Sequence, residues 1–163
     1  MTPRRLRPAL LALVLLPFAA LAHAADPAPA HAPFPEDFLQ WKQVKAPDFT
    51  KVPAGQKPTQ AGFVYANPAA LEGLRTGSYP EGAVLVFDIF KVVTQPDGSL
   101  ACGERASTST MVRDARFAET GGWQFEDYDI ASHAALEMNA AQACYACHTK
   151  VAPRQFVFTR LKS

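Results

Sequence analysis

The feature that most constrains the fold is the run 83–93, with the sequence AVLVFDIFKVV. Its β-branched and aromatic residues favour a β-strand. Successive side chains of a strand point to opposite faces, so Leu85 and Phe87 share one face while Val84 and Val86 share the other. Because both faces are mostly apolar, the run predicts a central strand that is covered on both sides.

The remaining elements are weaker and surround this strand in the sequence. Further strands are predicted at 63–65, 107–113, 123–129 and 155–160, and helices at 36–45, 68–76 and 132–145. The 14 prolines argue against a plain helical bundle, since a proline inside a helix removes a hydrogen bond. Strands in the middle and a helix near the end predict an α+β domain. We expect a mostly antiparallel sheet with short helices and a C-terminal helix.

The N-terminal segment 1–24 has the pattern of a secretory signal peptide. Three arginines precede an apolar run at 9–22, and Ala22-His23-Ala24 supplies a small-x-small cleavage site. The run is shorter than the roughly 20 residues that a membrane-spanning helix needs. We expect cleavage after Ala24, or alternatively after Ala22, with no membrane attachment afterwards. The mature protein is then exported, to the periplasm in a Gram-negative host.

An Ala/Pro-rich leader at 25–35 precedes a single predicted domain at 36–163. The composition of the leader favours an extended, mobile chain. Without segment 1–24 the chain has 13 basic and 15 acidic residues, a net charge of −2. This balance lacks the basic surplus of nucleic-acid-binding proteins, so no nucleic-acid partner is expected.

The chemistry is concentrated in Cys144-Tyr145-Ala146-Cys147-His148, which has the C-x-x-C-H pattern of c-type haem attachment. Two thiols three residues apart on a helical turn can form thioethers with the two vinyl groups of one haem. His148, directly after them, then supplies an imidazole nitrogen to the iron. Because the motif occurs once, we expect one covalently attached haem c per chain, with His148 as the metal ligand.

Other roles for these cysteines agree less well with the sequence. A structural zinc site normally uses four ligands, and beyond the motif only Cys102, His31 and His133 remain once the signal peptide is removed. A thioredoxin-like redox pair would follow a strand, and a structural disulfide would leave His148 without a role. Cys102 is interpreted as a small buried or half-buried thiol, with an intermolecular disulfide as the alternative.

The second axial position of the iron has no convincing ligand in the sequence. An electron-transfer cytochrome c would fill it with methionine. Met138 and His133 belong to the predicted helix that carries the motif and are displaced along its axis by about 1.5 Å per residue. Met111 lies within a predicted strand and is more typical of a core residue. We therefore expect an open distal site whose polarity decides which small ligands bind.

Several motifs, in this order, resemble the cytochrome P-460 family, which includes cytochrome c′-beta. They are Tyr79-Pro80-Glu81-Gly82-Ala83-Val84-Leu85-Val86, Met111-Val112-Arg113-Asp114, Gly121-Gly122-Trp123, the C-x-x-C-H motif and Phe156-Val157-Phe158-Thr159. The resemblance covers about 36–161. It implies a mostly antiparallel sheet with short helices, a homodimer, and a five-coordinate haem with His148 as the proximal ligand.

One position divides that family. Its hydroxylamine-oxidising members carry a haem-cross-linked lysine on the strand after a Pro-acid-Gly turn, and counting from Pro80 places this position at Phe87. An aromatic residue there is similar to the cytochrome c′-beta branch, in which phenylalanines cap the distal face. Phe87 is therefore predicted as one cap and Phe63 as a second, with ordinary core packing as the alternative for each. Lys91, roughly 13 Å further along the strand, would reach the haem only in a different register.

An aromatic cap without a proton donor favours neutral diatomic ligands such as NO and CO. The leading hypothesis is therefore a gas-binding haem protein for NO sequestration, sensing or detoxification. One alternative is a hydroxylamine-oxidising enzyme of the cross-linked kind, and another is an electron-transfer cytochrome c with a redox partner protein. Arg154, six residues after His148, is the predicted partner of a haem propionate, with a solvated surface arginine as the alternative.

Overall fold

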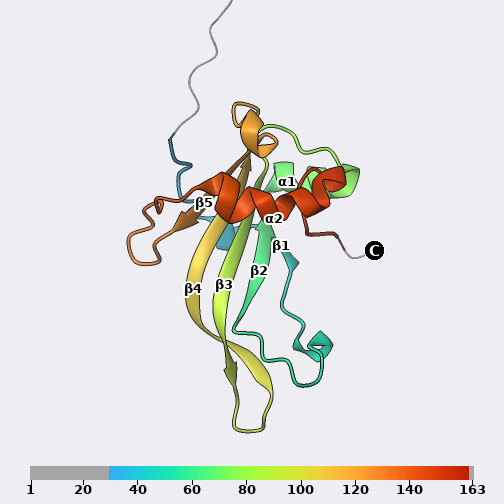
Figure 1. Cartoon of the computed structure of the whole chain (residues 1–163), viewed down its shortest axis with the longest axis vertical. Coiled ribbons are helices and arrows are strands. Elements are labelled where there is room, and N and C mark those ends of the chain that lie inside the picture. Colours follow the sequence, from blue (N-terminus) through green and yellow to red (C-terminus); the bar gives the residue numbers. More distant parts are fainter. Residues whose placement is uncertain (1–29, 162–163) are drawn as a thin grey trace, which may run out of the picture.

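A computed structural model describes residues 30–161 and has one antiparallel sheet with strand order β1-β2-β3-β4-β5 (Figure 1). The strands are β1 (Lys42–Lys45), β2 (Gln60–Ala66), β3 (Val84–Thr94), β4 (Leu100–Arg113) and β5 (Trp123–Tyr128). The helical elements are α1 (Pro68–Thr76), a π-helix (Ala141–Tyr145), α2 (Ala146–His148) and 3₁₀ turns at Phe38–Gln40, Phe49–Lys51, Ala118–Thr120 and Thr149–Arg154. The predicted α+β class is confirmed. The predicted signal peptide, 1–24, lies outside the described residues.

The strand β3 occupies the middle of the sheet, as its two apolar faces predict. It pairs with β2 on one side and with β4 on the other. Leu85 and Val86, which point to opposite faces, are both buried. Beyond the sheet, β3 and β4 continue together as a long hairpin, seen at the bottom of Figure 1.

The helix α1 begins and ends where the sequence predicts. The Asn67 side chain accepts a hydrogen bond from the backbone N–H of Ala70, and Pro68 occupies the first helical position. Gly77 adopts a left-handed conformation with φ of 81° and ends the helix. The same Asn67 side chain also accepts from the backbone N–H of Val84, so it joins the start of α1 to the start of β3.

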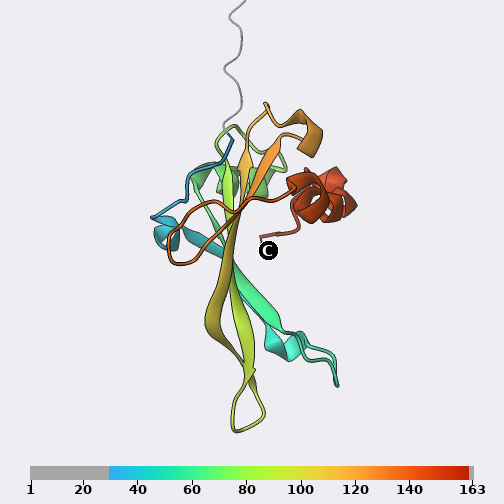
Figure 2. The same cartoon turned by 60° about the vertical axis from the view of Figure 1, so that its left-hand side comes forward.

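Different segments of the chain pack on the two faces of the sheet (Figure 2). The C-terminal helical segment, 141–154, lies over the face that carries Leu85, Met111 and Phe125, and these residues belong to the main hydrophobic core. The N-terminal segment lies against the other face, where Phe38 packs edge-on against Tyr65. Polar groups are buried on this second face. Among them is Asp88, whose Oδ1 atom lies 2.7 Å from the Nε atom of Arg105.

The predicted mobile leader differs from the structure over its last residues. His31 contacts the carboxylate of Glu126 at 3.3 Å, and the backbone N–H of Ala32 donates to the same carboxylate. The Tyr128 hydroxyl donates to the Ala32 carbonyl, and Phe34 stacks on the His133 ring. Residues 31–34 therefore belong to the folded domain, because they satisfy buried polar groups of β5.

Two other segments differ from their predicted secondary structure. The predicted helix at 36–45 is wrong beyond one 3₁₀ turn, because 42–45 pairs with β2 and forms the edge of the sheet. The predicted helix at 132–145 begins only at Ala141, since the Asp129 side chain accepts hydrogen bonds from the backbone of the residues after it and folds them as a loop.

The predicted strand at 155–160 is also wrong. Gln155 and Phe156 have φ angles of 50° and 65°, and this left-handed backbone cannot continue a strand. Residues 30–161 still contain five strands, as predicted, because Lys42–Lys45, which was predicted as part of a helix, forms β1. Across residues 30–161, no helix is both long and apolar enough to span a bilayer.

Candidate functional site

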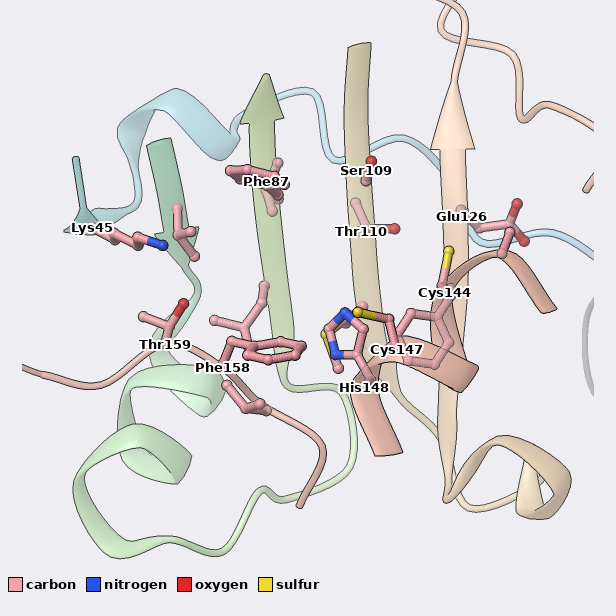
Figure 3. Close-up of a pocket in the computed structure, with 17 residues that line it drawn as sticks. Lys45, Phe87, Ser109, Thr110, Glu126, Cys144, Cys147, His148, Phe158 and Thr159 are labelled. Carbon is pink, nitrogen blue, oxygen red and sulfur yellow. The ribbon is translucent and has the colours of Figure 1, made fainter. Parts of the chain in front are cut away.

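A cavity of about 360 Å³ lies between the sheet and the C-terminal helical segment. All three functional residues of the C-x-x-C-H motif, Cys144, Cys147 and His148, line it from the helical side (Figure 3). From the sheet side it is lined by Phe87 of β3 and Ser109 of β4, which are register partners. In the folded chain, the C-x-x-C-H motif therefore lies across the cavity from β3, the strand that the sequence predicts to be central.

His148 is held in one tautomer and one orientation. Its Nδ1 atom lies 2.6 Å from the carbonyl oxygen of Phe156, and since a carbonyl can only accept, Nδ1 carries the proton. The rings of Phe125 and Phe158 each lie 5.0 Å from the imidazole, in edge-on contacts. Burial lowers the pKa of His148, which favours the neutral form. The lone pair of Nε2 is therefore available to a metal.

The Phe156 carbonyl reaches His148 because the chain turns sharply after the helical segment. Gln155 and Phe156 are both left-handed, and the Gln155 carbonyl accepts from the indole Nε1 of Trp123 at 3.0 Å. The Phe156 ring packs on Gly121, where an added Cβ would come within 2.3 Å of the ring. The Gly121-Gly122-Trp123 motif thus fixes the turn that orients His148.

The two cysteines of the motif have different surroundings. Cys144 is half-buried, and burial raises the pKa of its thiol to about 11, with the carboxylates of Asp127 and Glu126 adding to the effect. Cys147 is exposed. Both thiols are free, as is that of Cys102. Cys102 lies in β4 opposite Val92 in the long hairpin, and burial raises its pKa.

On the sheet side, three neighbouring strands place Phe87, Ser109 and Asp127 in one row, since Phe87 pairs with Ser109 and Ser109 pairs with Asp127. The Ser109 hydroxyl donates to the Asp127 carboxylate in a very short hydrogen bond. Its proton is therefore directed along the sheet to Asp127. Phe87 is 40% exposed, which is high for a phenylalanine on a central strand, and its ring faces the cavity.

Three residues considered from the sequence lie away from the cavity. Phe63 points to the opposite face of the sheet, where its ring packs edge-on against Phe90, because it pairs with Asp88 rather than Phe87. Arg154 donates to the Phe158 carbonyl at 3.3 Å and does not line the cavity. Lys91 forms an exposed ion pair with Glu104 at 2.8 Å in the long hairpin.

The sequence did not identify several of the lining residues, among them Lys45, Ser109 and Phe158. Lys45 belongs to a segment that the sequence predicts as a helix, so its position in the edge strand β1 could not be predicted. Ser109 lies on a predicted strand, and its alignment with Phe87 follows only from the pairing of β3 with β4. Phe158 stands in a motif of the family resemblance, and that motif is the one signal that could have identified it.

Neither methionine of the described chain faces Phe87 across the cavity. Met111 pairs with Leu85 and Phe125, and Phe125 contacts the His148 ring. Met111 lines the cavity from the sheet side, where it is buried in the main hydrophobic core. Met138 packs against the main core and does not line the cavity.

The family model described as Cytochrome P460 matches residues 35–159 of the chain. The chain belongs to this family. Membership implies a haem cofactor, in agreement with the C-x-x-C-H motif that lines the cavity. A search of curated proteins found no match.

The cavity of this cytochrome P-460 family protein has the chemistry that a haem requires. It presents two thiols, one imidazole nitrogen with a free lone pair, and predominantly apolar walls. Phe87 and Phe158, which are 40% and 44% exposed, line it, and a flat apolar group bound there would cover both rings. The residues present therefore fit a haem, and the Nε2 atom of His148 is the nitrogen that could ligate its iron.

Proposed function

We propose that this protein attaches one haem c through Cys144 and Cys147 and binds NO and CO at an open distal face. The observation that carries the proposal is that the attachment motif and Phe87 line a single cavity. When bound, the haem supplies an iron centre that takes a neutral diatomic ligand. His148 provides the proximal nitrogen. The residue that β3 places in the cavity is Phe87, whose aromatic ring cannot ligate iron.

The protein's own groups select against ligands that need a proton. Phe87 has no polar hydrogen, and the proton of its register partner Ser109 is committed to Asp127. O₂ bound to iron gains from a hydrogen-bond donor, whereas NO and CO bind without one. This arrangement supports the cytochrome c′-beta branch, with NO sequestration, sensing or detoxification as the role. It disfavours electron transfer, because Met138 does not line the cavity and Met111 is packed in the main hydrophobic core.

The attachment is tested by the mass of the protein made together with haem-attachment machinery. We expect the wild-type mass to include one haem, and this haem to remain bound after denaturation. Cys144→Ser combined with Cys147→Ser abolishes the attachment, while Cys102→Ser, the matched control, leaves it intact. Retention of covalent haem by the double variant would contradict the proposal.

Export and assembly are part of the same proposal. We infer that segment 1–24 directs the chain to the periplasm and that the mature protein forms a homodimer. N-terminal sequencing of the secreted protein is expected to begin at Ala25, and sedimentation is expected to give twice the chain mass. A retained Met1 or a monomeric species would contradict the respective inference.

A further inference from the structure

The cavity has two chemically different ends. At one end are the sulfur atoms of Cys144 and Cys147, and across the cavity, beyond Phe158, are the amino group of Lys45 and the hydroxyl of Thr159 (Figure 3). The Lys45 side chain extends toward the interior of the cavity rather than away from it. A cationic group and a hydroxyl therefore lie opposite the thiols, whereas the carboxylate of Glu126 lies on the thiol side (Figure 3).

A β-bulge directs Lys45 to this place. In the pairing of β1 with β2, Gln43 lies opposite Tyr65, yet Lys45 rather than Val44 lies opposite Val64. One extra residue in β1 thus shifts the register, and bulges often re-aim a side chain in this way. Directly opposed residues of a sheet share a face, so Lys45 shares the cavity face of Val64.

Neither polar group has a partner within the described part of the chain. Lys51 and Lys91 pair with carboxylates at 3.0 and 2.8 Å, whereas the Lys45 amino group forms no ion pair or hydrogen bond among residues 30–161. The Thr159 hydroxyl is likewise unpaired over the same residues. A cation and a hydroxyl that both face an apolar cavity form a site for an anionic group.

The chemistry of haem places its anionic groups at this end. The vinyl carbons that form thioethers occupy one edge of the porphyrin, and the two propionates occupy the opposite edge. A haem bound through Cys144 and Cys147 therefore directs its carboxylates away from the thiols. A carboxylate at the border of an apolar cavity is stabilised by a cationic partner.

We propose that Lys45, assisted by Thr159, binds a haem propionate and thereby raises the reduction potential of the iron. This inference rests on the proposed attachment of haem to Cys144 and Cys147. It replaces Arg154, the residue predicted for this role, whose guanidinium is directed to the Phe158 carbonyl. A positive charge beside the propionate stabilises the ferrous state, because the ferric iron carries one more positive charge.

The test is the pH dependence of the haem reduction potential in the holoprotein, with covalent haem first verified by mass. Lys45→Met is expected to lower the potential at neutral pH and to raise the propionate ionisation midpoint by about one pH unit or more. Lys45→Arg keeps the wild-type profile, and Thr159→Val gives a smaller shift in the same direction. Lys42→Met is the matched control, since Lys42 is also an exposed lysine of β1 and does not line the cavity.

Two results would overturn the assignment. One is a Lys45→Met profile that coincides with that of Lys42→Met in protein with its haem attached. The other is a tryptic haem peptide that contains Lys45, because the lysine would then be bonded to the haem ring rather than paired with a propionate. Protein that lacks covalent haem altogether contradicts the proposed attachment, and this inference with it, before any lysine variant is compared.

Discussion

The Nδ1 atom of His148 lies 2.6 Å from the carbonyl oxygen of Phe156. A ligating histidine commonly donates its second ring nitrogen in this way, which fixes the ring orientation and makes the other nitrogen a stronger ligand. Here the acceptor is a backbone carbonyl in a left-handed turn, supported by the packing of the Phe156 ring on Gly121. The orientation of His148, the proposed iron ligand, therefore depends on a glycine 27 positions away in the sequence.

Gly121→Ala is expected to disturb this orientation. An alanine would adopt an unfavourable φ of 68°, and its Cβ would meet the Phe156 ring at 2.3 Å. The two effects together should destabilise the protein by about 3 kcal/mol and shift the iron–histidine stretching frequency of the ferrous protein. Urea unfolding and resonance Raman spectroscopy measure the two quantities.

Gly98→Ala is the matched control for that variant. Gly98 has a φ of 84°, but no atom lies within 4 Å of an added Cβ. It should lose only about 1–2 kcal/mol and leave the iron–histidine frequency unchanged. Equal effects of the two variants on this frequency would show that the Phe156 turn does not orient His148.

Phe87→Ala is expected to accelerate CO binding. Removing the ring opens the space opposite His148, so the association rate measured by flash photolysis should rise about tenfold, equivalent to about 1.4 kcal/mol. Phe63→Ala removes the same side chain from the opposite face of the same sheet and should leave the rate unchanged. A similar rate change in both variants would count against Phe87 as the distal cap.

Asp127→Ala is expected to release the hydroxyl of Ser109 toward the cavity. The hydroxyl then becomes a donor to bound CO, and the C–O stretching frequency of the ferrous complex should fall. Adding Ser109→Ala to this variant removes the donor and should restore the wild-type frequency. A frequency that stays constant through the series would show that Ser109 does not reach the ligand.

The two thiols of the motif should differ in reactivity in haem-free protein. With a pKa of about 11, only about one in a thousand Cys144 thiols is ionised at pH 8, so iodoacetamide should modify the exposed Cys147 first. The Cys144 rate should increase about tenfold per pH unit up to about pH 11. Asp127→Asn removes a charge that raises this pKa and should move the Cys144 profile to lower pH. Mass spectrometry of timed digests separates the two sites, and equal rates at pH 8 would refute the difference.

The sequence predicted the elements whose stability is local or whose pattern is strong. The β3 strand was evident from its two apolar faces, and α1 from Asn67, Pro68 and Gly77, which act within one helix. The motif 144–148 predicted a haem cofactor, which the family match supports, because its meaning depends on spacing alone. In each case the information lies within a few neighbouring residues.

The wrong predictions concern segments whose structure depends on pairing with residues that are distant in the sequence. The edge strand β1 forms by pairing with β2, and the spacing of Phe38, Trp41 and Val44 does not reveal that pairing. Phe63 was placed in the cavity without the register that turns it to the other face. Lys45 reaches the cavity only through a bulge. Such long-range pairing is set by tertiary contacts, which override local propensity.

The most direct test of the account is the optical spectrum of the mature holoprotein, ferric and ferrous, with and without NO and CO. We predict a high-spin c-type spectrum in which the ferrous bands change when either gas is added. A low-spin spectrum that CO leaves unchanged would mean that a sixth protein ligand fills the distal site. A strongly red-shifted ferrous band would mean a cross-linked haem and would favour hydroxylamine oxidation. Either of these two results would contradict the open, Phe87-capped site.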